Sequence, residues 1–179
     1  MTAAAVVGVD IARRSDYAAA VHLLPDTDGY RWRVALAEQI PHSADYARLV
    51  AYIAHLADGG RVVAVDATGV GAPVLEYARA ATSHPVWGVT VHGGRRARQT
   101  GRWDLSLPKQ GLVDYARRGL EDGRMVIPRR APGADLLVSQ LAQIAPVRRR
   151  GRRPALEART GHDDVAFAWM VSVWMTRQR

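Results

Sequence analysis

The sequence predicts a single α/β domain in which helices flank a central mixed sheet of five strands, three antiparallel and then parallel ones. Three strand-like segments come before the first helical segment, an order typical of an antiparallel meander. Strands and helices then alternate, which favours parallel pairing of the later strands. With 179 residues, the chain is long enough for one well-packed domain and too short for two large ones, so we expect 1–179 to fold as one unit.

The first three strands are expected at residues 5–12, 17–24 and 30–40. The polar turn RRSD separates the first two, and PDTDG separates the next two with Pro, Asp and Gly where a hairpin needs them. A helix is then predicted from Ser43, its expected N-cap, to about Ala57, because apolar residues recur there at helical spacing.

The middle of the chain alternates between strand and helix. Arg61–Asp66 is apolar on both faces, as a buried parallel strand is, and Val86–Val91 is predicted as the fifth strand. Between them, the glycine turn ATGVGAP leads into a helix with Pro73 near its first turn. Residues 92–109 are rich in glycine and arginine, and we expect them to form a projecting, weakly structured basic hairpin.

The last third of the chain is predicted to be mostly helical. One helix runs from Pro108 to about Glu121, a second spans Ala134–Ile144, and the last begins near His162. The string MVIP is expected as a short strand and VRRRGRRP as a basic loop.

Composition excludes several classes of protein. The chain has no cysteine, which excludes a disulfide-stapled scaffold, a Cys-ligated zinc finger and a thiol nucleophile. The longest apolar stretch, Val165–Met175, is about half of the roughly 20 residues that a transmembrane helix needs. The N-terminus lacks the basic region of a signal peptide. We therefore expect a soluble, cytoplasmic protein with no membrane partner.

Charge points to nucleic acid. The formal net charge is +8, and every basic side chain except Lys109 is arginine or histidine. A strongly basic balance is the usual electrostatic feature of nucleic-acid binders, although a run of charge can also be only a solvated surface. The candidate DNA contacts fall in the predicted hairpin and in the later basic loop: Arg95, Arg96, Arg98, Arg102, Arg148, Arg149 and Arg150.

Two carboxylates interrupt otherwise apolar strands. Asp10 and Asp66 lie near the C-terminal ends of the first and fourth predicted strands, where open α/β sheets place their sites. A right-handed crossover would return the fourth strand beside the first, and neighbouring strands lie about 4.8 Å apart. The two side chains would then converge. Singly, either aspartate could instead cap the turn that follows it.

A third acidic position opens the last helix. Asp163 and Asp164 occupy its first turn, where the helix dipole also favours acids. Because the rest of this helix is almost wholly apolar, we expect it to be buried against the sheet with its acidic end toward the strand ends. Three convergent carboxylates without cysteine favour two divalent cations, Mg²⁺ or Mn²⁺, and in a basic protein they suggest phosphodiester hydrolysis.

Four strings carry a family resemblance: VVGVDIARRSDYAAAV, VVAVDATGVGAPVLEYAR, LPKQGLVDYARRGLEDGRMVIP and GHDDVAFAWM. In this order they resemble the nuclease domain of the large terminase subunit of tailed bacteriophages, a member of the ribonuclease H-like (retroviral integrase) superfamily. The resemblance implies an endonuclease that cuts concatemeric double-stranded viral DNA during packaging, with a packaging ATPase domain or subunit, a small terminase subunit and a portal as partners.

The same resemblance implies that Asp10, Asp66 and one of Asp163 and Asp164 hold the two metals. We favour Asp164 as the ligand and expect Asp163 to cap the helix or to lie behind the ligands. Lys109 is implied to lie near the catalytic face. Large terminases also carry a packaging ATPase, but no GxxxxGK[ST] phosphate loop occurs here, so we expect no ATPase domain in this chain.

Other assignments stay open. His162 has three possible roles, as a ligand, a proton shuttle or a solvated cap, and Asp16 is expected to hydrogen-bond within its turn. A sugar-kinase or actin-like phosphate site is disfavoured, since ARRSD lacks the glycine and small hydroxyl residues that approach phosphate. A non-catalytic DNA-binding module and a resolvase-type, structure-specific nuclease remain as alternatives.

Overall fold

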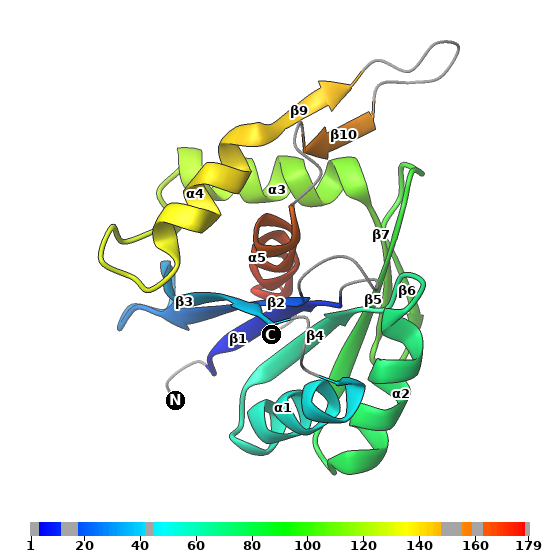
Figure 1. The fold of residues 1–179 in the computed structure, drawn as a ribbon. Helices are drawn as coiled ribbons and strands as arrows, with labels where there is room; N and C mark the ends of the chain where they lie inside the picture. The colour runs from blue at the N-terminus through cyan, green and yellow to red at the C-terminus, as the bar shows by residue number, and fades with distance from the viewer. Residues whose placement is uncertain (1–3, 12–17, 42–44, 148–154, 159–162, 178–179) are drawn as a thin grey trace.

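The computed structural model describes residues 4–11, 18–41, 45–147, 155–158 and 163–177. A central sheet of eight strands runs in the order β6-β7-β5-β4-β1-β2-β3-β8 (Figure 1). Its strands are β1 (Val6–Asp10), β2 (Ala18–Pro25), β3 (Trp32–Ile40), β4 (Val62–Asp66), β5 (Val86–His92), β6 (Arg98–Gly101), β7 (Asp104–Pro108) and β8 (Met125–Val126). The helices are α1 (Tyr46–Asp58), α2 (Gly71–Ala81), α3 (Lys109–Glu121), α4 (Ala134–Gln143) and α5 (Asp164–Met175). A second, two-stranded sheet pairs β9 (Ile144–Val147) with β10 (Ala155–Ala158).

The strand pairing confirms the predicted meander and parallel return. β1 pairs antiparallel with β2, and β2 pairs antiparallel with β3. After α1, the chain returns as β4 on the other side of β1 and parallel to it, and β5 then adds in parallel beside β4. This order makes β1 and β4 neighbours in the middle of the sheet. Their C-terminal ends therefore lie side by side at one edge of the sheet, the edge that is formed by strand ends.

The prediction of five strands was wrong, because the predicted basic hairpin joins the sheet as β6 and β7 and β8 adds at the opposite edge. β7 pairs in parallel with β5, and β6 pairs with β7 to form the edge of the sheet. The cause is the alternating pattern of DLSLP, which buries Leu105 and Leu107 on the sheet face while Ser106 stays more accessible. On the opposite edge, the two-residue β8 pairs with β3 and buries Met125.

Two helix starts differ from the prediction. Asp45, rather than Ser43, is the N-cap of α1, and its side chain accepts a hydrogen bond from the backbone N–H of Arg48 at 2.8 Å. Ser43 lies outside the described residues. α3 begins at Lys109 with Pro108 as its N-cap residue, because proline has no N–H to donate and its fixed φ suits the entry to a helix.

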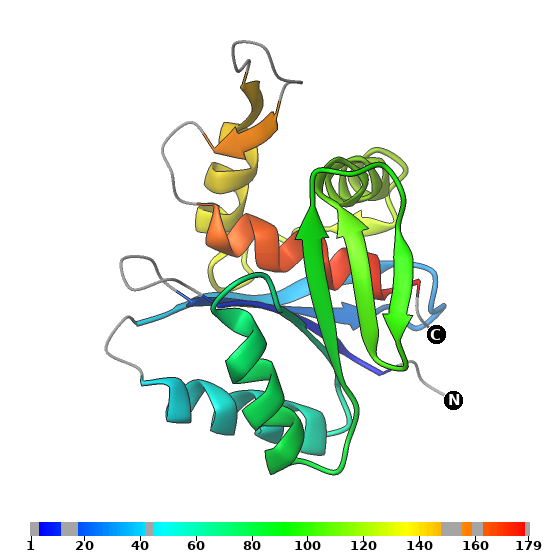
Figure 2. The ribbon, with the colours of Figure 1, turned by 90° about the vertical axis from the view of Figure 1, so that its right-hand side faces the viewer.

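The helices form one layer on each face of the sheet. α1 and α2 cover one face, and α5 covers the other, with α3 and α4 packed over α5 (Figures 1 and 2). Alternation along β1 divides its side chains between two cores: Val7 and Val9 face the α1–α2 side, and Val6 faces the α5 side. The sheet therefore presents a separate apolar surface to each layer.

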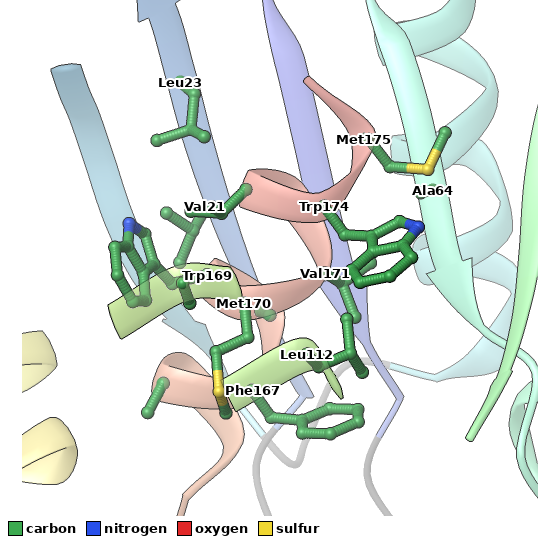
Figure 3. Packing of buried hydrophobic residues seen from close by; sticks show 14 of the residues in the cluster. Val21, Leu23, Ala64, Leu112, Phe167, Trp169, Met170, Val171, Trp174 and Met175 are labelled. Atoms are coloured by element: carbon green, nitrogen blue, oxygen red, sulfur yellow. The ribbon is translucent and has the colours of Figure 1, made fainter. Parts of the chain in front are cut away.

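α5 is the centre of its layer, and all twelve of its residues are buried. In Figure 3, Phe167 and Val171 of α5 lie beside Leu112 of α3, and Val21 lies on the neighbouring strand β2. No described helix is long and apolar enough to cross a membrane; α5, the most apolar of them, has 12 residues. Its burial holds the acidic first turn of α5 against the sheet.

Candidate functional site

Asp10 and Asp66 end two adjacent parallel strands. Asp10 is the last residue of β1, Asp66 is the last residue of β4, and the register of the two strands brings them next to each other. Side chains alternate along a strand, so Asp10 shares the α5 face with Gly8, and Asp66 shares it with Ala64. Both carboxylates therefore lie at one sheet edge and on the face that α5 covers.

The N-terminus of α5 brings a further acidic pair to this edge. α5 runs antiparallel to β1: Gly8 lies against the backbone of Ala168, and Asp164 comes one helical turn earlier while Asp10 comes two residues later. The Asp164 residue is only 8% exposed, and the Asp163 side chain is 27% exposed. Three separate elements thus contribute carboxylates to one place.

The carboxylates of Asp66, Asp163 and Asp164 lie near enough to Asp10 to influence its ionisation. The pKa of Asp10 is raised well above its ordinary value, first by burial and then by the charges of Asp66, Asp164 and Asp163. Burial also raises the pKa of Asp66. Among the described residues, no three His, Cys, Asp or Glu side chains already stand at the spacing of a formed metal centre. The carboxylates therefore repel one another when they are ionised.

Lys109 supplies the positive charge at this cluster. Lys109 is the first residue of α3. Its Nζ lies 3.7 Å from Asp163 Oδ2 and 5.9 Å from the ring centre of Phe167. Its positive charge acts to lower the pKa of both Asp10 and Asp66 and so opposes the increase that burial causes. Lys109 therefore lies beside the acidic cluster, and its ion pair with Asp163 accounts for a lysine at a helix N-terminus.

Of the two roles expected for Asp163, capping α5 or lying behind the ligands, its side chain does not take the first. Asp163 occupies the N-cap position, but its side chain makes no capping hydrogen bond. Instead, Gln140 of α4 reaches across, and its side-chain oxygen accepts a hydrogen bond from the backbone N–H of Ala166 at 3.0 Å. Sequence reasoning missed Gln140. The available signal was a polar residue on the buried stripe of α4 formed with Ala134 and Leu137.

The turn after β4 orients Asp66. Asp66 Oδ1 accepts a hydrogen bond from the backbone N–H of Thr68 at 2.8 Å, and Thr68 Oγ1 accepts one from the N–H of Val91 at 3.0 Å. Gly71 packs so closely on the Asp66 carbonyl that a Cβ there would overlap it. Sequence reasoning also missed Thr68, although an Asp side chain in a turn commonly accepts a hydrogen bond from the backbone N–H two residues later.

Three of the hairpin arginines share one hollow. Arg95, Arg96 and Arg98 line it together with His92, at the end of β5, and Ser106 of β7. All three arginines are exposed. The hollow begins at the C-terminal end of β5, the same end of the parallel strands at which Asp66 lies, because Asp66 pairs with Val89.

Arg102 does not join this group. It lies in the turn after β6, lines a different hollow with Arg79 and His84, and places its guanidinium 5.3 Å from the ring centre of Trp103. The remaining candidates, Arg148, Arg149, Arg150, His162 and Asp16, lie outside the described residues.

Comparisons with known proteins identify the fold. No family model matches the chain, and no curated protein matches it. Among solved structures, the magnesium-bound large terminase nuclease of the thermophilic phage G20c aligns with a TM-score of 0.69 at 20% identity, over 96% of this chain and 80% of that one.

Two further structures agree. The nuclease domain of the large terminase subunit gp2 of bacterial virus Sf6 aligns with a TM-score of 0.65 at 12% identity, over 96% of this chain and 88% of that one. The Mn-bound g2p large terminase nuclease domain of bacteriophage SPP1 aligns with a TM-score of 0.57 at 14% identity, over 99% and 88%. The chain therefore has the ribonuclease H-like fold of large terminase nuclease domains, as the sequence resemblance implied.

Proposed function

We propose that this chain is a metal-dependent endonuclease that cleaves double-stranded, concatemeric viral DNA during genome packaging. The observation that carries the proposal is the meeting of Asp10, Asp66 and the pair Asp163–Asp164 at one sheet edge, from three elements far apart in the sequence. The shared fold adds support, because the matched structures are nuclease domains and two of them contain Mg or Mn.

The donor set fits hard divalent cations. Every candidate ligand is a carboxylate oxygen, the donor that Mg²⁺ and Mn²⁺ prefer. We assign Asp10, Asp66 and Asp164 as the ligands of two such ions, with Asp163 beside them. When bound, the ions would activate a water molecule and stabilise the leaving oxygen of the phosphodiester. The raised pKa of Asp10 supports this assignment, since a cation would relieve the repulsion that contributes to it.

Lys109 and Thr68 influence the ionisation and the orientation of the proposed metal-binding carboxylates. The charge of Lys109 lowers the pKa of Asp10 and of Asp66, which favours the ionised form that binds metal. The Thr68 N–H donates a hydrogen bond to one oxygen of Asp66, which fixes the orientation of this carboxylate. Lys109 is 35% exposed at its side chain, so it can also approach a phosphate of bound DNA.

The DNA backbone would lie across the hollow lined by Arg95, Arg96 and Arg98. Guanidinium groups bind phosphate in bidentate fashion and keep their charge at any physiological pH. Contacts of this kind carry no sequence information, so this chain would bind DNA without marked base preference. From the family resemblance of the sequence, we propose that a packaging ATPase, a small terminase subunit and a portal deliver the DNA to it.

A plasmid assay tests the proposal. With Mg²⁺ or Mn²⁺, the protein should nick and then linearise supercoiled plasmid, and EDTA should stop the reaction. Asp10→Asn should lower the rate by at least 100-fold. Glu76→Gln is the matched control, because this exposed carboxylate of α2 lies outside the cluster; it should cut like the parent protein.

Other outcomes favour the alternatives. A protein that retards DNA but leaves it intact with either metal would be a non-catalytic DNA-binding module. A protein that cuts four-way junctions much faster than linear duplex would be a resolvase-type nuclease.

A further inference from the structure

One buried polar residue is not used by the proposed chemistry, yet it touches the helix that carries the acidic pair. Gln140 of α4 is 4% exposed, and its Oε1 accepts the hydrogen bond from Ala166 N–H at 3.0 Å. It shares the buried stripe of its helix with Ala134 and Leu137. A buried amide costs free energy unless it is hydrogen-bonded, so a glutamine at this position calls for an explanation beyond packing.

The hydrogen bond replaces an ordinary helix cap. The first four N–H groups of a helix have no partner within the helix, and a side chain at the N-cap residue usually satisfies one of them. At α5 the N-cap residue is Asp163, which makes no such bond and instead pairs with Lys109 at 3.7 Å. Gln140 takes over the capping role from another helix, which leaves the Asp163 carboxylate at the acidic cluster.

The start of the helix that carries Gln140 is anchored to the sheet. Gly133, the N-cap of α4, has φ +77° and lies so close to the Ala37 carbonyl of β3 that a Cβ would overlap it. The N–H of Ala37 also donates to the carbonyl of Pro132 at 2.9 Å. Backbone contacts therefore join the start of α4 to β3, and Gln140 joins α4 to the first turn of α5.

We propose that Gln140 is a positioning residue: by capping α5 from α4, it holds the first turn of α5 where Asp164 can share divalent cations with Asp10 and Asp66. This inference rests on the proposed function for the role of the metal. Outer hydrogen bonds that orient metal ligands commonly change metal affinity by 10- to 100-fold when removed. The capping bond is thus expected to influence metal affinity more than the chemistry that follows.

The main test compares two conservative variants of one helix face. Gln140→Met keeps the size of the side chain and removes the acceptor, while Leu137→Met perturbs packing on the same buried stripe and leaves the acceptor in place. Metal affinity is read as the Mg²⁺ concentration at half-maximal thermal stabilisation of the DNA-free protein. We expect this concentration to rise about 10-fold in Gln140→Met and to stay within about twofold of the parent in Leu137→Met.

A restoring variant and a kinetic readout separate positioning from general damage. Gln140→Glu keeps an acceptor oxygen, so its Mg²⁺ midpoint should lie closer to that of the parent than the midpoint of Gln140→Met. In the plasmid assay, Gln140→Met should need about 10-fold more Mg²⁺ and reach a similar maximal rate. Equal midpoints for the parent, Gln140→Met and Leu137→Met would overturn the proposal.

Amide hydrogen exchange of the parent protein provides a test without a variant. The amide of Ala166 should exchange slowly, because its N–H donates to a buried oxygen. An Ala166 amide that exchanges as fast as an open helix end would refute the capping role even where Gln140→Met does not fold. If the parent itself shows no Mg²⁺ stabilisation and no cleavage, the proposed function fails; if it shows both and Gln140→Met matches it, only the positioning role fails.

Discussion

Gly8 of β1 faces the backbone of Ala168 in α5 so closely that a Cβ at position 8 would overlap the Ala168 carbonyl oxygen. The same Cβ would lie 2.6 Å from the backbone nitrogen of Ser172. Both obstacles are backbone atoms, which cannot swing away as the end of a side chain can. The close approach sets the distance between the central strand and the central helix, and therefore between Asp10 and Asp164.

Gly8→Ala is expected to destabilise the protein strongly. Overpacking a well-filled core costs about 1–3 kcal/mol, and here the added methyl group meets backbone on two sides, so we expect the upper part of that range or more. Chemical denaturation measures the loss. Gly93→Ala is the matched control, because a Cβ at position 93 meets nothing within 4 Å. Similar stabilities for the two variants would contradict the close packing of α5 on β1.

The positions of Asp10 and Asp66 follow from local patterns in the sequence. Each ends an apolar run, and the order of strands and helices makes their two strands parallel neighbours. The apolar sequence of α5 likewise predicts a buried helix with its acids at one end. These inferences succeed because strand alternation, crossover handedness and hydrophobic burial depend on residues close together in the chain.

Contacts between distant elements could not be predicted in the same way. The cap of α5 comes from Gln140, which lies 26 residues from its partner Ala166, and no local pattern near Asp163 announces it. The pairing of β7 with β5 was missed because the glycine- and arginine-rich stretch before it dominates the composition of residues 92–109, while only Leu105 and Leu107 carry the burial. Tertiary packing decides both cases.

Asp10→Asn is expected to raise the thermal stability of the metal-free protein. Because the pKa of Asp10 is raised in the folded state, the folded protein binds more protons than the unfolded one above the ordinary value of 3.8, and stability falls as pH rises through this window. Asparagine removes this loss. We expect a gain of roughly 1 kcal/mol or more, about 2–4 °C in Tm, at pH 7.5 in EDTA. The gain should shrink toward pH 4; a lower Tm for Asp10→Asn at pH 7.5 would contradict carboxylate repulsion.

Divalent cations should stabilise the parent protein and not Asp10→Asn. A ligand that binds only the folded state adds about 2.7 kcal/mol at 100 times its dissociation constant, which is roughly 5–10 °C for a chain of this size. Thermal unfolding with increasing Mg²⁺ or Mn²⁺ measures the shift, and NaCl at matched ionic strength controls for screening. Equal shifts in the parent and in Asp10→Asn would place the cations elsewhere.

Replacing Arg95, Arg96 and Arg98 with alanine should weaken DNA binding and flatten its dependence on salt. Each phosphate contact that is lost should reduce the slope of log affinity against log salt by about 1. Fluorescence anisotropy with duplex DNA at several salt concentrations measures both quantities. Arg48→Ala, an exposed position on α1 that does not line the hollow, should leave the slope unchanged. An unchanged slope in the triple variant would mean that the DNA path avoids the hollow.

Lys109→Met is expected to shift the pH dependence of cleavage toward higher pH. The charge of Lys109 lowers the pKa of Asp10 and Asp66, so its removal raises both values and a higher pH is needed to ionise the carboxylates for metal binding. The acid limb of the rate profile should therefore move upward at subsaturating Mg²⁺, and the shift should diminish when Mg²⁺ saturates. Arg117→Met is the control, because it removes a positive charge from the same helix two turns away from Lys109. Among the described ion pairs, Arg117 pairs only with Glu121, at 3.7 Å. A uniform loss of rate at all pH values would instead mean that Lys109 acts on the substrate and does not tune the carboxylates.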